Sequence, residues 1–232
     1  MEKQKYAAIV LAAGSGKRMN SKVHKQYLII QDRPVLYYSL KAFEDSAVDE
    51  IVLVVGKGEE KFCRKEIVDK YGISKVKAIV EGGKERYHSV FEGLKQTSDA
   101  DYVLIHDGAR PFVNQDIIRR CMQEVQNYQA CVVGMPVKDT IKIADEEGYA
   151  KQTPDRKNVW MIQTPQTFSY ALIYEAYEEM LKTEDTAITD DAMVLERIKG
   201  KKSKLIEGSY RNIKITTPED LLIANVYLQH PE

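Results

Sequence analysis

The sequence predicts an α/β fold with three layers, in which a mostly parallel, Rossmann-like sheet carries a protruding β-hairpin arm. Short β-branched runs alternate with helical patterns through the first two thirds of the chain. These runs are apolar throughout, which is typical of parallel strands covered by helices on both faces. After Val137 the alternation stops, and a polar hairpin takes the place of the next helix.

The predicted strands of the sheet are continuous apolar runs. They are Tyr6 to Ala12, Ile51 to Val55, Val76 to Val80, Tyr102 to His106 and Cys131 to Val137. The helices between them place apolar side chains on one face at helical spacing. These side chains are Val35, Leu36, Leu40 and Phe43, then Ile117, Ile118, Cys121 and Val125, and, less regularly, Phe62, Ile67 and Tyr71. Because ligands bind at the carboxyl ends of the strands in such sheets, we expect the functional site there.

The predicted hairpin follows the last of these strands. Thr140 to Ala144 alternates, a turn over residues 145–148 follows, and Tyr149 to Gln152 can run back. The hairpin has too few apolar residues to form a core strand pair. We therefore expect one domain over residues 1–232, with residues 138–157 as an excursion from it.

The C-terminal third is predicted to return to helices around one more strand. A helix runs from about Tyr170 to Leu181, and a second is entered through Thr189, Asp190 and Asp191, whose acids suit a helix N-terminus. Residues 212–216 are predicted to form a strand. Thr217 as cap, followed by Pro218, Glu219 and Asp220, predicts the start of the last helix.

The composition indicates a soluble globular protein. The chain has 232 residues, of which 44% are apolar and 30% charged, and its net charge is −1. That charge argues against a general binder of nucleic acids or anionic membranes. The basic start and apolar run at residues 1–13 have some features of a signal peptide, but they lead directly into a glycine loop, so we expect a cytoplasmic protein. The three cysteines, at 63, 121 and 131, lack metal or redox spacing.

The first strand leads into a loop with the character of a phosphate-binding loop. Its sequence, from Leu11 to Met19, is Leu-Ala-Ala-Gly-Ser-Gly-Lys-Arg-Met, and Lys25-Gln26 follow. Glycines let backbone N–H groups point at an anion, and nearby cations add charge-assisted hydrogen bonds. Met19 stands where a dinucleotide fingerprint has its third glycine, and the glycine spacing does not fit a Walker loop. A plain strand-to-helix turn is the alternative.

Two further strand ends carry candidate residues. The turn Glu81-Gly82-Gly83 opens a helix with Arg86 and Ser89, although an ordinary turn explains this equally well. The sequence from Ile105 to Pro111 places Asp107 at the binding edge, where it could hold Mg²⁺ or serve as a turn or cap residue. The four histidines, at 24, 88, 106 and 230, have no evident nucleophile partner, so a Ser-His-Asp hydrolase has little support.

Taken in order, these segments resemble the 2-C-methyl-D-erythritol 4-phosphate cytidylyltransferases of the non-mevalonate isoprenoid pathway. The resemblance covers essentially the whole chain. It is carried by residues 11–19, 25–26, 82–83 with 86 and 89, 106–111, 136–142, 163–168, 189–192 and 212–221. Two departures are visible: His24 stands where the family usually has proline, and Gly108 stands where alanine is common.

The resemblance implies a nucleotidyltransferase that uses CTP and Mg²⁺ and acts on a sugar-alcohol phosphate. The implied contacts to CTP are Ala12, Ala13, Gly14, Ser15, Gly16, Gly83, Ser89, Asp107 and Lys214, and Asp107 would also hold the metal. The implied contacts to the sugar phosphate are Arg110, Thr140, Arg156 and Thr189. Arg18 and Lys25 would stabilise the transition state, while Arg156 and Lys214 would aim the nucleophile. The family uses the arm to clasp a second subunit, which implies a homodimer.

The implied mechanism agrees with the absence of an evident base. A substrate phosphate is largely ionised at pH 7, so its oxygen can attack the α-phosphorus of CTP directly. Three alternatives stay open: a sister enzyme for ribitol 5-phosphate, a nicotinamide dehydrogenase, and a nucleotide-binding regulatory protein without turnover.

Overall fold

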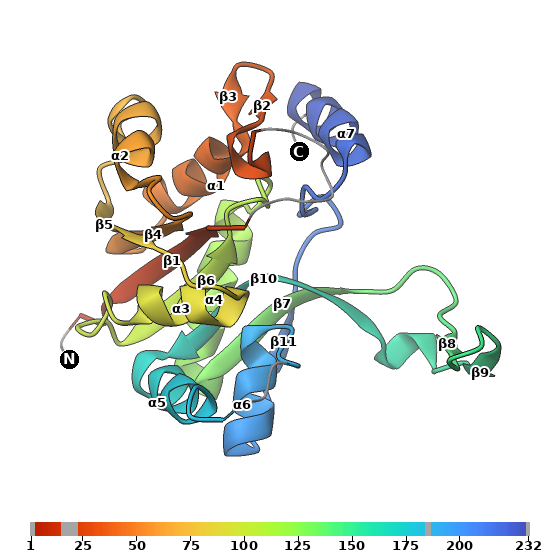
Figure 1. Cartoon of the computed structure of the whole chain (residues 1–232). Helices are drawn as coiled ribbons and strands as arrows, with labels where there is room; N and C mark the ends of the chain where they lie inside the picture. The colour runs from red at the N-terminus through yellow and green to blue at the C-terminus, as the bar shows by residue number, and fades with distance from the viewer. Residues whose placement is uncertain (1–2, 15–22, 184–186, 231–232) are drawn as a thin grey trace.

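The central feature of the computed structural model is a seven-stranded sheet with helices on both faces (Figure 1). The structure describes residues 3–14, 23–183 and 187–230. The strand order is β11-β7-β10-β6-β1-β4-β5. Among the described strands of this sheet, β10 alone runs antiparallel to its neighbours. The predicted three-layer, mostly parallel α/β fold is thus confirmed.

Five strands of the large sheet match the five predicted apolar runs, and β10 and β11 were not predicted. Their bounds are β1 Tyr6–Ala12, β4 Glu50–Val55, β5 Val76–Glu81, β6 Tyr102–Asp107, β7 Ala130–Pro136, β10 Trp160–Ser169 and β11 Lys204–Glu207. Two small sheets accompany it, formed by β2 Ile29–Ile30 with β3 Arg33–Pro34 and by β8 Ile143–Ala144 with β9 Ala150–Gln152. β1 lies between β6 and β4, so its carboxyl end lies inside the sheet and not at an outer strand.

Six of the described α-helices divide between the two faces of the large sheet, and α7 packs in a separate cluster beside β2. The α-helices are α1 Val35–Glu44, α2 Glu60–Cys63, α3 Arg86–Leu94, α4 Gln115–Tyr128, α5 Tyr170–Met180, α6 Asp191–Lys199 and α7 Pro218–Gln229. Shorter turns are the 3₁₀ segments η2 Lys25–Tyr27 and η4 Arg156–Asn158 and the π-helix η3 Arg64–Asp69.

Alternate side chains of β1 show how the faces are built. Ala8 and Val10 pack with α1, α2 and α4, whereas Ala7 and Ile9 pack with α3, α5 and α6. Because successive strand residues point to opposite faces, an all-apolar strand supplies both cores. The fully buried side chains of β1 therefore fix the strand between two helical layers, and its carboxyl end opens at the sheet edge.

The start of the last helix confirms a sequence signal. Thr217 accepts a hydrogen bond from the backbone of Asp220, and the Asp220 carboxylate accepts one from the Thr217 N–H at 2.8 Å, forming a capping box with Pro218 in the first turn. At α6, Asp190 caps the helix by accepting from the N–H of Met193 at 2.9 Å. Both predicted helix starts are confirmed.

The hairpin formed by β8 and β9 projects away from the body of the protein (Figure 1). Nearly all side chains of residues 138–158 are exposed, and Tyr149 is 73% exposed. Its turn is closed by the Asp145 N–H, which donates to the Tyr149 carbonyl, and Gly148 has a φ of +89°, which favours glycine. The arm therefore has no core of its own within this chain.

Two sequence predictions fail in the C-terminal third. Residues 212–216 do not form a strand: they run extended, and the Ile215 N–H donates to the Ala109 carbonyl, while the strand of this region is β11. The buried Asn212 side chain donates to the Thr164 carbonyl at 2.9 Å, which ties the segment to the middle of β10. The strand β10 was not predicted, because Pro165 and the polar residues around it lack the pattern of a core strand.

None of the helices in the described part of the chain is both long enough and apolar enough to cross a bilayer.

Candidate active site

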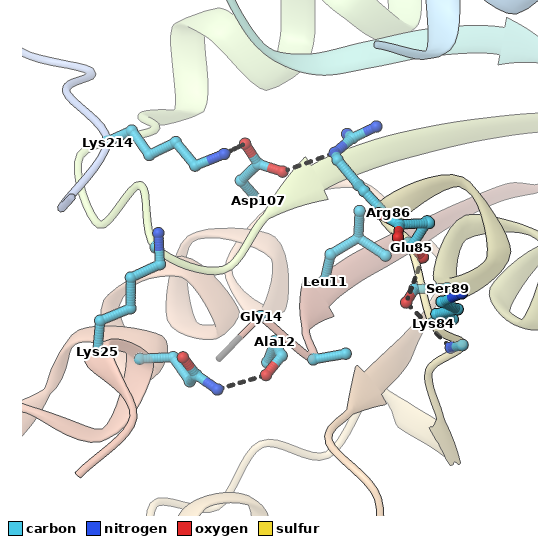
Figure 2. A pocket seen from close by; sticks show the side chains of 14 residues that line it. Leu11, Ala12, Gly14, Lys25, Lys84, Glu85, Arg86, Ser89, Asp107 and Lys214 are labelled. Carbon is cyan, nitrogen blue, oxygen red and sulfur yellow. Dashed lines mark hydrogen bonds and ion pairs between the residues drawn. The ribbon is translucent and has the colours of Figure 1, made fainter. Parts of the chain in front are cut away.

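A pocket of about 370 Å³ lies where β1, β5 and β6 end (Figure 2). Its lining comes from the loop after β1, the turn η2, the start of α3, the end of β6 and the segment before α7. The lining residues are Leu11, Ala12, Ala13, Gly14, Lys25, Gln26, Gly83, Lys84, Glu85, Arg86, Ser89, Asp107, Ala109 and Lys214. The pocket thus lies at the carboxyl edge of the sheet, where the sequence predicted the site.

The two glycine loops meet on one side of this pocket. A Cβ on Gly82 would lie 2.5 Å from the Cβ of Ala13 and 2.6 Å from the Oγ of Ser89. The Gly83 N–H donates to Ser89 Oγ at 3.1 Å, and that hydroxyl donates to the Glu85 carbonyl at 3.3 Å. Glycine is therefore required for the close approach of the two loops, and Ser89 fixes the second loop on the first turn of α3.

On the opposite side, the turn η2 brings Lys25 to the pocket. The next residue, Gln26, is 1% exposed, and its Nε2 donates to the Ala12 carbonyl at 2.5 Å. This bond attaches the turn to the end of β1. Figure 2 shows Lys25 and Lys214 reaching into the pocket from one side and Arg86 from the other.

Asp107 lies at the floor of the pocket among three cations. Its Oδ2 is 2.7 Å from Lys214 Nζ and 3.9 Å from Arg110 Nε, and its Oδ1 is 3.2 Å from Arg86 Nε. Burial by itself raises the pKa of Asp107, but the charges of Arg86, Lys214 and Arg110 outweigh it and hold that pKa far below its usual value. Asp107 is thus a carboxylate throughout the physiological range.

A second pocket, of about 310 Å³, lies on the other side of these charges. It shares Arg86, Asp107 and Lys214 with the first pocket. Its remaining lining residues are Arg110, Ile162, Gln163, Thr164, Gln166, Thr189 and Asp190. Two ligands bound in the two pockets would therefore meet at one charged boundary.

The half-buried Arg86 and the fully buried Asp191 form an ion pair that sequence reasoning missed. Arg86 Nη1 and Nη2 donate to the two carboxylate oxygens of Asp191 at 2.8 and 2.9 Å, and the Tyr177 hydroxyl donates to the same carboxylate at 2.6 Å. Gln166 Oε1 accepts from the Asp191 N–H at 3.0 Å. In the sequence, the acidic start of α6 indicates only helix capping. It does not reveal that Asp191 also pairs with Arg86, because the two residues are far apart in the chain.

His106 is a satisfied core histidine, as expected from the sequence. Its Nδ1 lies 3.0 Å from Thr164 Oγ1, and its Nε2 lies 3.2 Å from the Arg110 carbonyl. Burial lowers the pKa of His106 to about 4. The ring is therefore neutral at pH 7 and braces the strand end that carries Asp107.

The predicted site residues divide into three groups. The structure brings together Ala12, Ala13, Gly14, Lys25, Gly83, Ser89, Asp107, Lys214, Arg110 and Thr189 around the two pockets. Ser15, Gly16 and Arg18 lie outside the described residues. Thr140 and Arg156 are exposed on the arm, line neither pocket of their own chain, and Arg156 Nη1 donates to the Lys138 carbonyl at 2.8 Å.

The chain is similar to known proteins over nearly its whole length. The family model of IspD, 2-C-methyl-D-erythritol 4-phosphate cytidylyltransferase, matches residues 6–230. The chain belongs to this family. It is 54% identical over 224 residues to the protein of that name from Lachnospira eligens, covering 96% of this chain and 98% of that one. With the protein of the same name from Lachnoclostridium phytofermentans it shares 50% identity over 226 residues, or 97% of each chain.

Solved structures of cytidylyltransferases share the fold. The 4-diphosphocytidyl-2C-methyl-D-erythritol synthase from Anaerococcus prevotii matches with a TM-score of 0.86 and 38% identity, over 98% of this chain and 97% of that one. The 2-C-methyl-D-erythritol 4-phosphate cytidylyltransferase from Thermus thermophilus matches with a TM-score of 0.77 and 30% identity, over 95% of this chain and 98% of that one. The predicted family and enzyme class are confirmed, and a nicotinamide dehydrogenase is excluded.

The two departures from the cytidylyltransferase pattern have local explanations. A Cβ on Gly108 would lie 2.8 Å from Leu36 Cδ1 and 3.0 Å from the Leu11 carbonyl, so glycine suits the close packing here. His24 has a φ of −61°, which is the value that proline would fix. Its backbone therefore follows the course expected of the family at this position.

The donor set fits a magnesium ion that arrives with a nucleotide. The described residues hold no cluster of three or more histidine, cysteine or acidic side chains able to bind a metal. Mg²⁺ usually takes one or two carboxylates together with phosphate oxygens. Asp107 is ionised and lines both pockets. Among the described carboxylates, Glu85 lines only the first pocket and Asp190 only the second, so Asp107 is the one that would meet a metal held between the two ligands.

Proposed function

We propose that the protein transfers CMP from CTP to 2-C-methyl-D-erythritol 4-phosphate, forming 4-diphosphocytidyl-2-C-methyl-D-erythritol and pyrophosphate. An oxygen of the substrate phosphate bonds to the α-phosphorus of CTP. The bond from that phosphorus to the bridging oxygen breaks, and pyrophosphate leaves with the electron pair. The observation that carries this proposal is the pair of pockets that meet at Arg86, Asp107 and Lys214.

The pocket at the end of β1 is the proposed CTP site. Ala12, Ala13, Gly14, Gly83 and Ser89 line it. We assign Ala12 to Gly16 to the base and phosphates of CTP, and Gly83 and Ser89 to the cytosine. The lack of space for a Cβ at Gly82 supports this role indirectly, because it lets the loop after β1 and the turn before α3 lie together on one side of the pocket. Lys214 binds the phosphates from the boundary between the pockets.

The second pocket is the proposed site of the sugar-alcohol phosphate. Arg110 and Thr189 line it in this chain. A guanidinium can bind a phosphate through two hydrogen bonds, and a threonine hydroxyl can donate another. We assign Thr140 and Arg156 to the same ligand, but from the arm of a second subunit.

The reaction needs positioning and positive charge more than it needs a base. A phosphate monoester is largely dianionic at pH 7, so no proton has to be removed before attack. Arg18 and Lys25 stabilise the charge that develops on the transferring phosphoryl group, and Lys214 with Arg156 aims the attacking oxygen. His106 supplies no proton in this scheme, because its neutral ring is already engaged by Thr164 and the Arg110 carbonyl.

Asp107 is the residue that would hold the magnesium ion. When bound, Mg²⁺ neutralises phosphate charge and favours departure of pyrophosphate. Asp107 contributes a carboxylate whose depressed pKa keeps it ionised, and it also holds Lys214 at 2.7 Å. The Asp107 carboxylate thus holds the cationic groups of Arg86, Arg110 and Lys214 in place between the two pockets.

The arm supports the proposal of a homodimer with arm exchange. Residues 138–157 project from the body, carry Thr140 and Arg156, and expose Ile143 and Tyr149, with Met161 exposed just beyond them. A two-fold symmetric exchange would place each arm in the other subunit's second pocket. The proposed partners are therefore CTP, the sugar-alcohol phosphate and a second copy of this chain, without nucleic acid or membrane. The three cysteines are buried free thiols, which agrees with a reducing cytoplasm.

Pyrophosphate release tests the proposed reaction. CTP, UTP and ATP are each combined with the methylerythritol and ribitol phosphates in the presence of Mg²⁺. We expect turnover with CTP and the methylerythritol substrate. A preference for ribitol 5-phosphate would establish the sister activity, and CTP binding without turnover would establish a regulatory protein.

A further inference from the structure

The turn that carries Lys25 is fixed by a cluster outside the pocket. Glu59, which precedes α2, places its carboxylate beside this turn. Its Oε2 accepts from the Tyr27 hydroxyl at 2.7 Å and from the Gly56 N–H at 3.0 Å, and its Oε1 lies 2.7 Å from His24 Nδ1. One carboxylate therefore contacts the residues on both sides of the Lys25–Gln26 pair.

The missing side chain of Gly56 leaves the space that the Glu59 carboxylate occupies. A Cβ on Gly56 would lie 2.7 Å from Glu59 Oε2, so any larger residue would push the carboxylate away. Gly56 directly follows β4, so its N–H anchors Glu59 to the sheet edge that also holds the pocket. The Glu59 side chain is 19% exposed, and water competes little for its oxygens.

The aromatic contacts add to the same restraint. The Tyr27 ring packs edge-on against Phe62 at 5.1 Å between centroids, and the His24 ring stacks on Tyr27 at 6.3 Å. The Tyr27 hydroxyl also lies 3.1 Å from Cys63 Sγ. The turn is therefore attached at His24 and Tyr27 to the segment of α2, and at Gln26 to the end of β1.

From this geometry we propose that Glu59 is a positioning residue, which fixes the turn η2 through His24 and Tyr27 and so orients Lys25 toward the transferring phosphoryl group. The inference rests on the proposed role of Lys25. A cation that stabilises a transition state must lie at the right place before the charge develops, because a displacement of about 1 Å can cost up to about a hundredfold in rate. Glu59 lies outside both pockets and acts through Lys25 alone.

A double-mutant cycle tests this coupling by steady-state kinetics. Glu59→Gln should lower kcat about tenfold and change the KM for CTP less than about twofold, because orientation and not binding is lost. In a Lys25→Ala background the same change should lower kcat by less than about twofold, since the group that it orients is gone. Glu60→Gln is the matched control, because it removes the same charge from the next position and leaves the three contacts in place.

Changes at His24 provide a second, milder test. His24→Ala should lower kcat, as Glu59→Gln does. His24→Asn should keep most of the wild-type kcat, since an amide nitrogen can take the place of Nδ1. If Glu59→Gln does not fold, the comparison of His24→Ala with His24→Asn still tests the inference. A wild-type kcat in both Glu59→Gln and His24→Ala, or an equal loss with and without Lys25, would overturn the inference. A wild-type kcat in Lys25→Ala would instead overturn the proposed role of Lys25 on which it rests.

Discussion

Arg86 and Asp191, 105 positions apart in the sequence, form two parallel hydrogen bonds of 2.8 and 2.9 Å at the boundary of the two pockets. The Nε of the same guanidinium lies 3.2 Å from Asp107. The Arg86 side chain thus links Asp191, at the start of α6, with Asp107, at the end of β6. Because Asp107 and Thr189 line the second pocket, this link helps to hold two of its walls together.

Asp191→Asn should lower the free energy of unfolding by about 2 kcal/mol, because it removes the buried carboxylate that pairs with the half-buried Arg86 guanidinium. Asp191 is fully buried and also accepts from Tyr177, so water cannot replace the lost partner. Denaturant unfolding measures the change. Asp116→Asn removes an exposed partner of Arg119 and should cost less than about 1 kcal/mol. A similar small loss in both variants would show that the pair of Arg86 and Asp191 contributes little.

Lys25→Ala and Arg18→Ala should each lower kcat by about 10²–10³, with a smaller effect on the KM of either substrate. The reason is that these cations are assigned to charge that grows in the transition state. Lys61→Ala, at an exposed position of α2, should leave kcat unchanged. Folding is verified by circular dichroism, and a normal kcat in a folded Lys25 variant would contradict the assignment.

Asp107→Asn should weaken the dependence of turnover on Mg²⁺ and lower kcat together. The neutral amide is a poorer magnesium ligand and no longer holds Lys214 through an ion pair. Magnesium titrations of the initial rate compare this variant with Asp69→Asn, which changes an exposed carboxylate at the end of η3. An unchanged titration in Asp107→Asn would place the metal on other ligands.

The shared-site model predicts complementation between two inactive variants. When Lys25→Ala and Arg156→Ala chains exchange subunits, about half of the dimers contain both chains, and each of these has one site free of both changes. Activity should recover to about a quarter of the wild-type value. Verified heterodimers without recovered activity would show that Arg156 serves the site of its own chain.

His106 should make stability depend on pH between about 4 and 6.5. Burial lowers the pKa of His106 to about 4 in the folded protein, whereas an unfolded histidine titrates near 6.5. Between these values the unfolded chain binds a proton that the folded one excludes, so stability falls by about 3 kcal/mol as the pH falls through this range.

Urea unfolding at several pH values measures this effect. His106→Asn should remove that part of the slope, because no imidazole remains to be protonated on unfolding. His230→Gln, at an exposed position, should keep the wild-type slope. An identical slope in His106→Asn would assign the pH dependence to other groups.

Local properties of the chain made much of the fold predictable. Apolar runs and helical spacing placed most of the strands and helices, because these periodicities follow from backbone geometry alone. Two strands of the large sheet, β10 and β11, were not predicted. β10 enters the sheet with Pro165 and buried polar residues, and its place between β6 and β7 depends on partners far along the chain. The strand predicted at residues 212–216 is absent for the converse reason. Their apolar alternation suits a strand, but Asn212 bonds to Thr164 within β10 and Ile215 bonds to Ala109 after β6, so no ladder forms.

Sequence alone was enough to predict the α/β class, the glycine loops, the edge of the sheet that holds the site, the polar arm and the resemblance to the family. Each of these depends on residues close together in the chain or on an ordered set of short motifs. The tertiary structure decided that Arg86 neutralises Asp191, that Lys214 reaches Asp107, and that Glu59 braces the turn of Lys25. These contacts depend on how helices and strands converge, because a charge pattern along the chain does not reveal which side chains the topology brings within hydrogen-bond distance.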